Sequence, residues 1–139
     1  MLDLIIKNGK CYIDKDLKDV DIGILNSKIV KIGKLDEDAS KSIDASGLTV
    51  LPGCIDTQTH FREPGSTDTE DLASGSRAAI VGGITSVFEM PNTNPATTNK
   101  AEFQRKIDLA KNRMYCNHAF YFGATPTNPS ELADLKGLD

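Results

Sequence analysis

Four polar residues stand at every second position near the middle of this 139-residue chain: Asp56, Gln58, His60 and Arg62. Alternate residues of a β-strand point to the same side, so a strand here would project the first three together, and Arg62 with them if it extends that far. A histidine can bind zinc, an arginine can hold a carboxylate through two hydrogen bonds, and an aspartate can orient either group. Burying four such side chains without a ligand, metal ion or water would be costly. The spacing therefore predicts a binding site.

Two other titratable residues are weaker candidates. His118 begins an apolar run with no partner signal, and we interpret it as structural. Glu89 lies near the end of another apolar run, where it either faces a site or forms an ion pair. A lone histidine such as His60 is also structural more often than metal-binding, so the metal hypothesis depends on the pattern around it.

The elements before Pro52-Gly53 are short, β-rich runs. Asn8-Gly9 is a strong hairpin signal between the apolar runs on either side of it. Asn26-Ser27 predicts a second turn, between residues 22–25 and 29–32. We expect these runs to form a small antiparallel sheet.

The elements after Pro52 alternate between strand, loop and helix. We expect helices near Thr67, where Thr67-x-x-Glu70 has the form of a capping box, after Asn99, and after Asn128-Pro129. The second of these helices has an apolar stripe of Phe103, Ile107, Ala110 and Met114. Three strand–helix units in series predict a parallel α/β arrangement, either a doubly wound sheet or a barrel. No Gly-x-Gly-x-x-Gly or Walker-type loop follows a strand, so nucleotide binding has no positive support.

Composition excludes several classes of protein. The net charge is −4 and the lysines are scattered among acids, which argues against nucleic acid as the main partner. No apolar run is long enough to span a bilayer and no signal-peptide pattern opens the chain, so we expect no membrane association. Cys11, Cys54 and Cys116 are odd in number and far apart, which favours a reducing, cytoplasmic location. We expect Cys54 and Cys116 to be small buried fillers.

Two blocks of sequence carry a resemblance to a known family. Residues 52–65 resemble the Asp-x-His-x-His-x-Arg signature that opens the barrel of cyclic amidohydrolases, and Arg62-Glu63-Pro64-Gly65 is similar to dihydroorotases and some allantoinases. The run from Met90 to Pro95 resembles the Met-Pro-Asn-Thr-x-Pro stretch of dihydroorotases, where allantoinases and dihydropyrimidinases usually differ. The resemblance covers essentially the whole chain.

The resemblance implies an α/β fold with two parts. Residues 1–52 would form a small β-rich segment of the amidohydrolase type. Residues 53–139 would form the first three βα units of an incomplete TIM-like (β/α) barrel. Such barrels need eight strands and typically about 250 residues, so we interpret the chain as truncated or as one part of a longer protein.

The resemblance also implies roles for individual residues. His60 matches a zinc ligand, and Gln58 occupies the place of the first histidine of the pair, where it is either a poor ligand or an inert substitution. The family holds one or two zinc ions, so one metal position is in doubt. Arg62 and Asn92 match the residues that hold the substrate carboxylate, and Asp56 has a supporting role. The family's catalytic aspartate and remaining ligands come from later strands, so none of the catalytic groups is within this chain.

The implied activity is that of dihydroorotase, the reversible cyclisation of N-carbamoyl-L-aspartate to dihydroorotate in pyrimidine biosynthesis, with the fragment alone inactive. Another cyclic amidohydrolase such as an allantoinase is a second interpretation. A third is a non-catalytic, dihydroorotase-like protein, either an assembly partner of aspartate transcarbamoylase or a decayed gene product, which Gln58 and the missing strands favour. A homo-oligomer is also compatible with the sequence.

Overall fold

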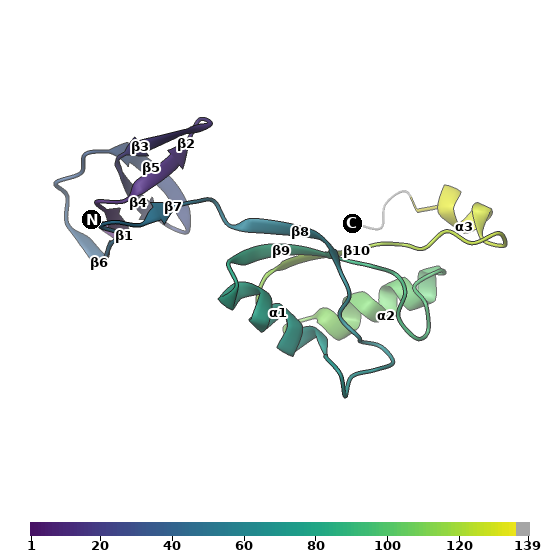
Figure 1. The fold of residues 1–139 in the computed structure, drawn as a ribbon. Coiled ribbons are helices and arrows are strands. Elements are labelled where there is room, and N and C mark those ends of the chain that lie inside the picture. The colour runs from purple at the N-terminus through teal and green to yellow at the C-terminus, as the bar shows by residue number, and fades with distance from the viewer. Residues whose placement is uncertain (136–139) are drawn as a thin grey trace. The chain divides into compact units, whose positions relative to one another are not determined.

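The computed structural model describes residues 1–135 and divides the chain into two compact units, Met1–Pro52 and Gly53–Asp139. The first unit contains only strands, and the second alternates strands with helices (Figure 1). This arrangement is the mixed α/β fold with a β-rich N-terminal part that the sequence predicts. None of the helices within residues 1–135 has the length and apolar character needed to span a membrane.

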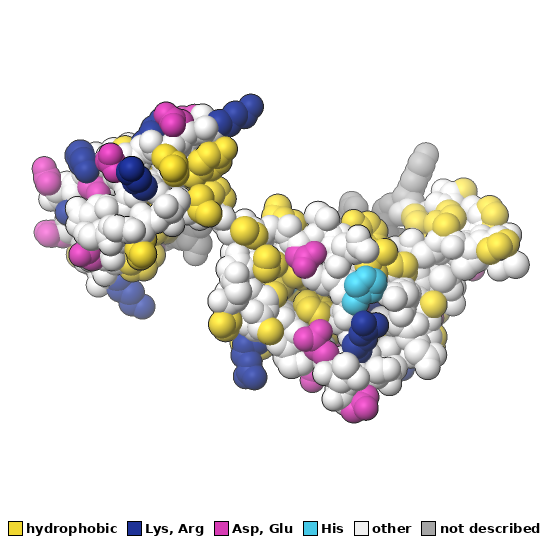
Figure 2. All heavy atoms as spheres, in the orientation of Figure 1, with side chains coloured by type: hydrophobic (Ala, Val, Ile, Leu, Met, Phe, Trp, Pro, Cys, Tyr) yellow, Lys and Arg dark blue, Asp and Glu magenta, His cyan; other side chains and the backbone are white. Residues whose placement is uncertain are grey.

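Two mixed sheets make up the first unit. Its strands are β1 (Leu2–Lys7), β2 (Lys10–Ile13), β3 (Asp16–Asp19), β4 (Asp21–Leu25), β5 (Lys28–Gly33), β6 (Ala39–Asp44) and β7 (Thr49–Val50). One sheet has the order β5-β4-β1-β6 and the other β3-β2-β7. The pairs β1–β6 and β2–β7 are parallel, so the expectation of one antiparallel sheet is wrong. Figure 2 shows acidic and basic side chains interspersed on the visible face of this unit.

The predicted hairpin at Asn8-Gly9 is also wrong, because β1 and β2 belong to different sheets. Asn8 has a φ of 65°, its backbone N–H donates to Asp21 Oδ1 (3.1 Å), and its side chain donates to Asp44 Oδ1 (3.0 Å). A Cβ atom on Gly9 would lie 2.7 Å from Val50 Cγ2, so only glycine lets the chain pass so close to β7. The dipeptide forms a corner between two sheets.

The turn at Asn26-Ser27 is confirmed. It joins β4 and β5, which pair in antiparallel fashion. Asn26 and Ser27 have φ values of 51° and 59°, the positive values that two-residue type I′ turns require. Asp3 Oδ2 accepts a hydrogen bond from the Asn26 N–H at 2.7 Å and ties the turn to β1.

A three-stranded parallel sheet with helices forms the second unit, as predicted. Its elements are β8 (Cys54–Thr59), α1 (Leu72–Val81), β9 (Ile84–Glu89), α2 (Lys100–Ala110), β10 (Asn117–Phe120) and α3 (Pro129–Ala133). The strand order is β10-β9-β8, so β9 is central. Figure 1 shows α1 and α2 on the same side of the sheet. The buried core beneath them consists of Phe61, Leu72, Val87, Ala110 and Cys116.

Helix α1 begins later than the sequence predicts. Its N-cap is Asp71 rather than Thr67. Asp71 Oδ1 accepts from the Ser74 N–H at 2.6 Å, and Ser74 Oγ accepts from the Asp71 N–H at 3.1 Å, which is a complete capping box. The pKa of the Asp71 carboxyl is lowered, mainly by the hydrogen bond from the Ser74 backbone. The later start places Leu72, which is fully buried, at the first helical position.

The other two helix starts match the prediction more closely. Asn99 caps α2, with its Oδ1 accepting from the Glu102 N–H at 2.9 Å. Helix α3 begins at Pro129, but Asn128 makes no side-chain cap bond there. The Asn128 amide instead donates to the carbonyl of Gly123 (2.9 Å) and so holds the loop before α3.

Two expectations about buried side chains are met only in part. Cys54 is exposed, whereas Cys116 is buried as expected. In α2 the buried residues are Lys106 and Ala110, while Ile107 is 36% exposed. The inner face of α2 therefore holds a lysine beside Ala110 of the predicted apolar stripe, and Met114 of that stripe packs against the core beyond the helix.

Candidate active site

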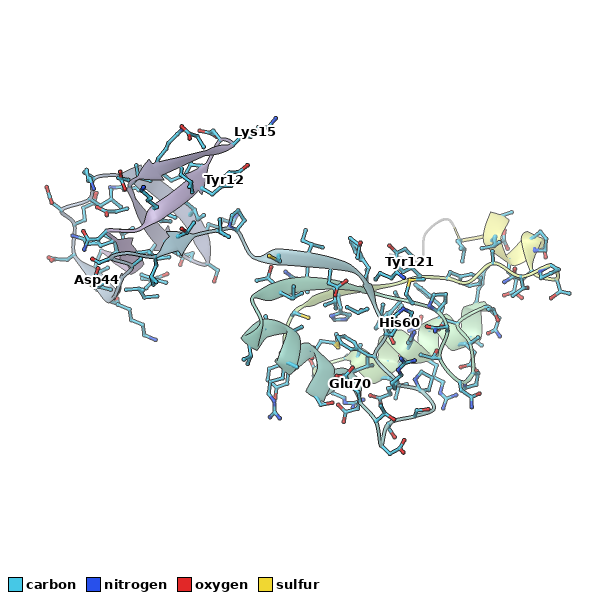
Figure 3. All side chains as sticks on the ribbon, viewed as in Figure 1. Tyr12, Lys15, Asp44, His60, Glu70 and Tyr121 are labelled. Atoms are coloured by element: carbon cyan, nitrogen blue, oxygen red, sulfur yellow. The ribbon has the colours of Figure 1, made fainter. Side chains whose placement is uncertain are left out.

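The structure brings two of the predicted residues into direct contact. His60 follows the end of β8, and Asn92 follows the end of β9 by three residues. His60 Nδ1 lies 2.9 Å from Asn92 Oδ1, although the two residues are 32 positions apart. Figure 3 labels His60 at this end of the sheet. The carboxyl ends of neighbouring parallel strands meet at one edge, which is where α/β proteins carry their sites.

The His60–Asn92 contact determines which atoms stay available. An amide oxygen can only accept a hydrogen bond, so the Nδ1–H of His60 donates to it. In the neutral tautomer this arrangement leaves Nε2 without a hydrogen, so its lone pair can bind a cation. The amide hydrogens of Asn92 can donate to an anion such as a carboxylate. The pair therefore offers a metal-binding atom and an anion-binding group side by side.

The other predicted residues are placed more loosely. Asp56 Oδ1 accepts from the backbone N–H of Gln58 at 2.9 Å, so Asp56 stabilises its own strand. The register of β8 against β9 shifts between Asp56 and Thr59, so the uninterrupted alternation assumed from the sequence does not hold. The side chains of Gln58 and Arg62 are exposed, and Arg62 lies in the loop after β8.

The loop that carries Arg62 is anchored by its neighbour Glu63, which the sequence analysis missed. Glu63 is 7% exposed and accepts two hydrogen bonds from Arg113, at 2.7 and 3.0 Å, and one from the Leu72 N–H at 2.9 Å. The hydrogen bonds with Glu63 raise the pKa of Arg113. Glu63 thus ties the loop after β8 to the start of α1 and to the turn after α2. No local pattern links it to a partner 50 residues away.

The loops after β8 and β9 pack against each other. Gly65 has a φ of 120°, and a Cβ atom there would lie 2.8 Å from both Cβ and the carbonyl oxygen of Asn94. The Asn94 N–H donates to the Pro64 carbonyl at 3.0 Å. The Arg62 loop and the Asn92 loop therefore form one packed surface beside His60.

Glu89 and Lys106 form a buried pair beneath this surface. The Lys106 ammonium lies 2.9 Å from Glu89 Oε2, and the two side chains are 0% and 1% exposed. Burial raises the pKa of Glu89 to about 7 and lowers the pKa of Lys106. Of the two interpretations that the sequence leaves open for Glu89, the ion pair is the observed one.

The described residues do not form a complete metal site. Within residues 1–135, no three His, Cys, Asp or Glu side chains lie close enough together to hold a metal ion. Protein zinc sites use three or four such ligands. His60 offers one nitrogen, and His118 is engaged elsewhere, with its Nδ1 3.3 Å from the Cys116 carbonyl.

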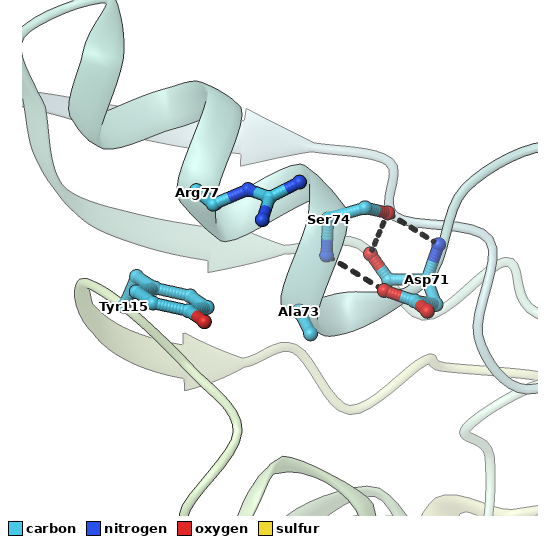
Figure 4. A pocket seen from close by; sticks show the side chains of 5 residues that line it. All are labelled: Asp71, Ala73, Ser74, Arg77 and Tyr115. Carbon is cyan, nitrogen blue, oxygen red and sulfur yellow. Dashed lines mark hydrogen bonds between the residues drawn. The ribbon is translucent and has the colours of Figure 1, made fainter.

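A surface depression on the second unit is separate from the predicted residues. It lies at the first turns of α1 (Figure 4) and contains the capping box of that helix. The Asp71 carboxylate in the depression therefore already accepts a hydrogen bond from the N-terminus of the helix. The residues lining the depression are Asp71, Ala73, Ser74, Arg77 and Tyr115.

Comparison with known proteins identifies similar sequences. Residues 49–134 match the model of the amidohydrolase family. A dihydroorotase from Methanothermobacter thermautotrophicus is 41% identical over 138 residues, which are 99% of this chain and 30% of that protein. An allantoinase from Escherichia coli is 42% identical over 134 residues, 96% of this chain and 30% of that protein. The chain therefore spans about 30% of the length of these curated relatives.

Solved structures show the same similarity. L-Hydantoinase (dihydropyrimidinase) from Arthrobacter aurescens matches with a TM-score of 0.87 and 32% identity, over 97% of this chain and 31% of that one. D-Hydantoinase (dihydropyrimidinase) from Thermus sp. matches with a TM-score of 0.76 and 26% identity, over 95% of this chain and 30% of that one. These two enzymes thus contain the fold of the described residues.

Proposed function

We propose that this chain, which belongs to the amidohydrolase family, supplies part of the active site of a cyclic amidohydrolase. We refer to a protein in which this chain is joined to the remainder of such an enzyme as the full-length form. In it, the second unit would be the first three βα units of a TIM-like barrel. Further strands would supply the ligands and acid–base groups that residues 1–135 lack.

Within this family we propose the dihydroorotase reaction, in which N-carbamoyl-L-aspartate closes reversibly to dihydroorotate with loss of water. The single observation that carries the proposal is the His60–Asn92 contact, which places an amide donor for an anion beside a metal-binding nitrogen. Support also comes from the Met90–Pro95 block and from the 41% identity to a dihydroorotase.

Each residue of the site has one proposed task. Arg62 and the Asn92 amide hold the carboxylate that stays outside the ring, which fixes the orientation of the substrate. His60 supplies one ligand to zinc, and an ion there would polarise the carbonyl that reacts. Asp56 holds the strand that leads to His60 through its bond to the Gln58 N–H.

Substitutions of the two anion-binding residues test the proposed function. We expect Arg62→Lys and Asn92→Ala in the full-length form each to weaken binding of carbamoyl aspartate roughly ten- to a hundredfold. The reason is that a charge-assisted hydrogen bond contributes about 1.5–3 kcal/mol. Isothermal titration calorimetry measures the affinity. Arg77→Lys and Asn117→Ala, at exposed positions elsewhere, are matched controls. Unchanged affinity in both site variants would exclude the carboxylate clamp.

A second substitution tests the metal position at Gln58. We expect Gln58→His in the full-length form to raise the zinc content per chain, because it adds an imidazole nitrogen where the family has one. Elemental analysis by mass spectrometry measures the content, and Gln104→His, an exposed position on α2, is the control. Two zinc ions already bound before the substitution would show that Gln58 does not impair the site.

Two other functions are favoured by specific observations. The 42% identity to an allantoinase favours a different cyclic amide as substrate, and turnover of allantoin but not of dihydroorotate would establish it. Gln58 favours a non-catalytic protein that assembles with aspartate transcarbamoylase or with its own copies. Stable association with that enzyme, without turnover of either substrate, would establish the non-catalytic function.

A further inference from the structure

Every backbone carbonyl of residues 89–91, the segment that leads from β9 to Asn92, accepts a hydrogen bond. The Met90 N–H donates to the Thr59 carbonyl at 2.9 Å and joins the segment to the end of β8. Two of the three carbonyl bonds come from backbone N–H groups, and one comes from a side chain. The three acceptor–donor pairs are Glu89 O with Tyr121 N (2.9 Å), Met90 O with Lys106 Nζ (3.1 Å) and Pro91 O with Thr97 N (2.9 Å).

Lys106 is the side chain in this set, and its position is unusual. It lies in the middle of α2, is fully buried, and has its ammonium 5.4 Å from the centre of the Phe120 ring. Burying an ammonium costs several kcal/mol unless its partners compensate. The stability of the fold therefore depends on how well the partners of Lys106 compensate for its burial.

Lys106 interacts with its two partners in different ways. The Glu89 carboxylate is at ion-pair distance, yet neither of its oxygens accepts a hydrogen bond of regular geometry. The regular hydrogen bond goes to the Met90 carbonyl. Glu89 thus neutralises the charge, while the directional interaction of Lys106 fixes the backbone two residues before Asn92.

We propose that Lys106 is a positioning residue that holds the Met90 carbonyl and thereby places Asn92 against His60. Asn92 itself is exposed and lies outside regular secondary structure, so its place depends on the bonds of its neighbours: those of residues 89–91 before it and the bond of the Asn94 N–H to the Pro64 carbonyl after it. That Lys106 holds this backbone follows from its hydrogen bond to the Met90 carbonyl. That it thereby affects binding of the substrate carboxylate rests on the proposed function.

The test compares two variants of the full-length form. Glu89→Leu combined with Lys106→Met removes both charges at similar volume and leaves neither charge unpaired, so we expect the fold to be retained. Glu89→Gln keeps Lys106 and its bond to Met90 but breaks the buried pair from one side, so exchange in each variant is compared after its change in global stability is accounted for. The readout is amide hydrogen exchange of the peptide covering residues 90–98, with urea unfolding as the measure of global stability. We expect exchange in this peptide to rise at least roughly tenfold in the double variant and to stay within about twofold in Glu89→Gln.

Kinetics give a second readout that a merely structural role would not produce. Asn92 binds the carboxylate in both the ground state and the transition state, so the double variant should raise KM roughly tenfold with kcat little changed. If the unaltered protein turns over no cyclic amide, the proposed function fails while the exchange measurement still decides the role of Lys106.

Two outcomes would overturn the proposal. One is a double variant whose residues 90–98 exchange as slowly as in the unaltered protein. The other is a Glu89→Gln variant that loosens the segment as much as the double variant does. If the double variant does not fold, Lys106→Met alone at pH 5 replaces it, because the Glu89 carboxyl is then protonated and no charge is stranded.

Discussion

Replacing Lys106 by methionine is expected to lower the free energy of unfolding of the full-length form by about 3–5 kcal/mol at pH 8. The substitution leaves Glu89 buried without a cation, and breaking a buried pair from one side has a cost of this size. The loss is larger than the deletion of a surface ion pair would give, because water cannot reach either group.

The loss should depend on pH, and its sign follows from the pKa of Glu89. Burial raises this pKa from 4.5 to about 7 in the folded protein, and without Lys106 it rises further. A carboxyl with a raised pKa contributes its full stability below its unfolded value and loses it as the pH rises through the folded value. The unaltered protein loses this stability too as the pH rises to about 7, and only the variant goes on losing it above that value. The cost of Lys106→Met is therefore smallest between pH 5 and about pH 7 and grows toward pH 8.

Urea unfolding of both proteins between pH 5 and pH 8 measures this difference. Lys111→Met, at an exposed position at the end of the same helix, is the control and should change stability by less than about 0.5 kcal/mol at each pH. An equal loss at pH 5 and pH 8 would show that Glu89 is not the group responsible.

Local patterns predicted the features that depend on local chemistry. The Asn26-Ser27 turn and the Asn99 cap follow from backbone preferences of a few consecutive residues, and both were found. The family resemblance, rather than a local pattern, placed His60 and Asn92 in one site, and their contact is explained by parallel strands whose ends meet at one edge. The turn and the cap require no knowledge of distant packing.

Features that depend on distant packing were not predictable in the same way. Asn8-Gly9 has the composition of a hairpin, but the pairing of β1 is decided by strands β4 and β6, which come later in the chain. The start of α1 is decided by the burial of Leu72, which favours the cap at Asp71 over the one at Thr67.

Lys106 and Glu63, which hold the loops of the site, could not be predicted from the sequence for a related reason. Lysine is almost always solvated, so nothing in the sequence marks Lys106 as buried except its place one turn before Ala110. Glu63 meets Arg113 only because α2 ends near the start of α1. Charged partners that are far apart in the sequence leave no periodic signal, and a structure is needed to find them.

The second large effect is expected from the chain on its own. Residues 1–139 expressed alone should not form a stable monomer and should not convert dihydroorotate. Among the described residues, the sheet of the second unit has three strands, so both β8 and β10 are edges with unpaired backbone groups. The sheet and the residue that follows β10 leave apolar surface exposed, with Ile55 61%, Phe88 36% and Tyr121 42% accessible. Exposed edges and apolar surface together favour association.

The site is incomplete for an independent reason. In the proposed site His60 would be one ligand where zinc needs at least three, and no three possible ligand side chains cluster within residues 1–135. The isolated chain should therefore aggregate or survive as an oligomer, and should bind zinc weakly. Light scattering gives its mass, urea unfolding its cooperativity, and an assay with added zinc its turnover. A monomer that unfolds cooperatively would refute the stability prediction, and zinc-dependent turnover would refute the functional one.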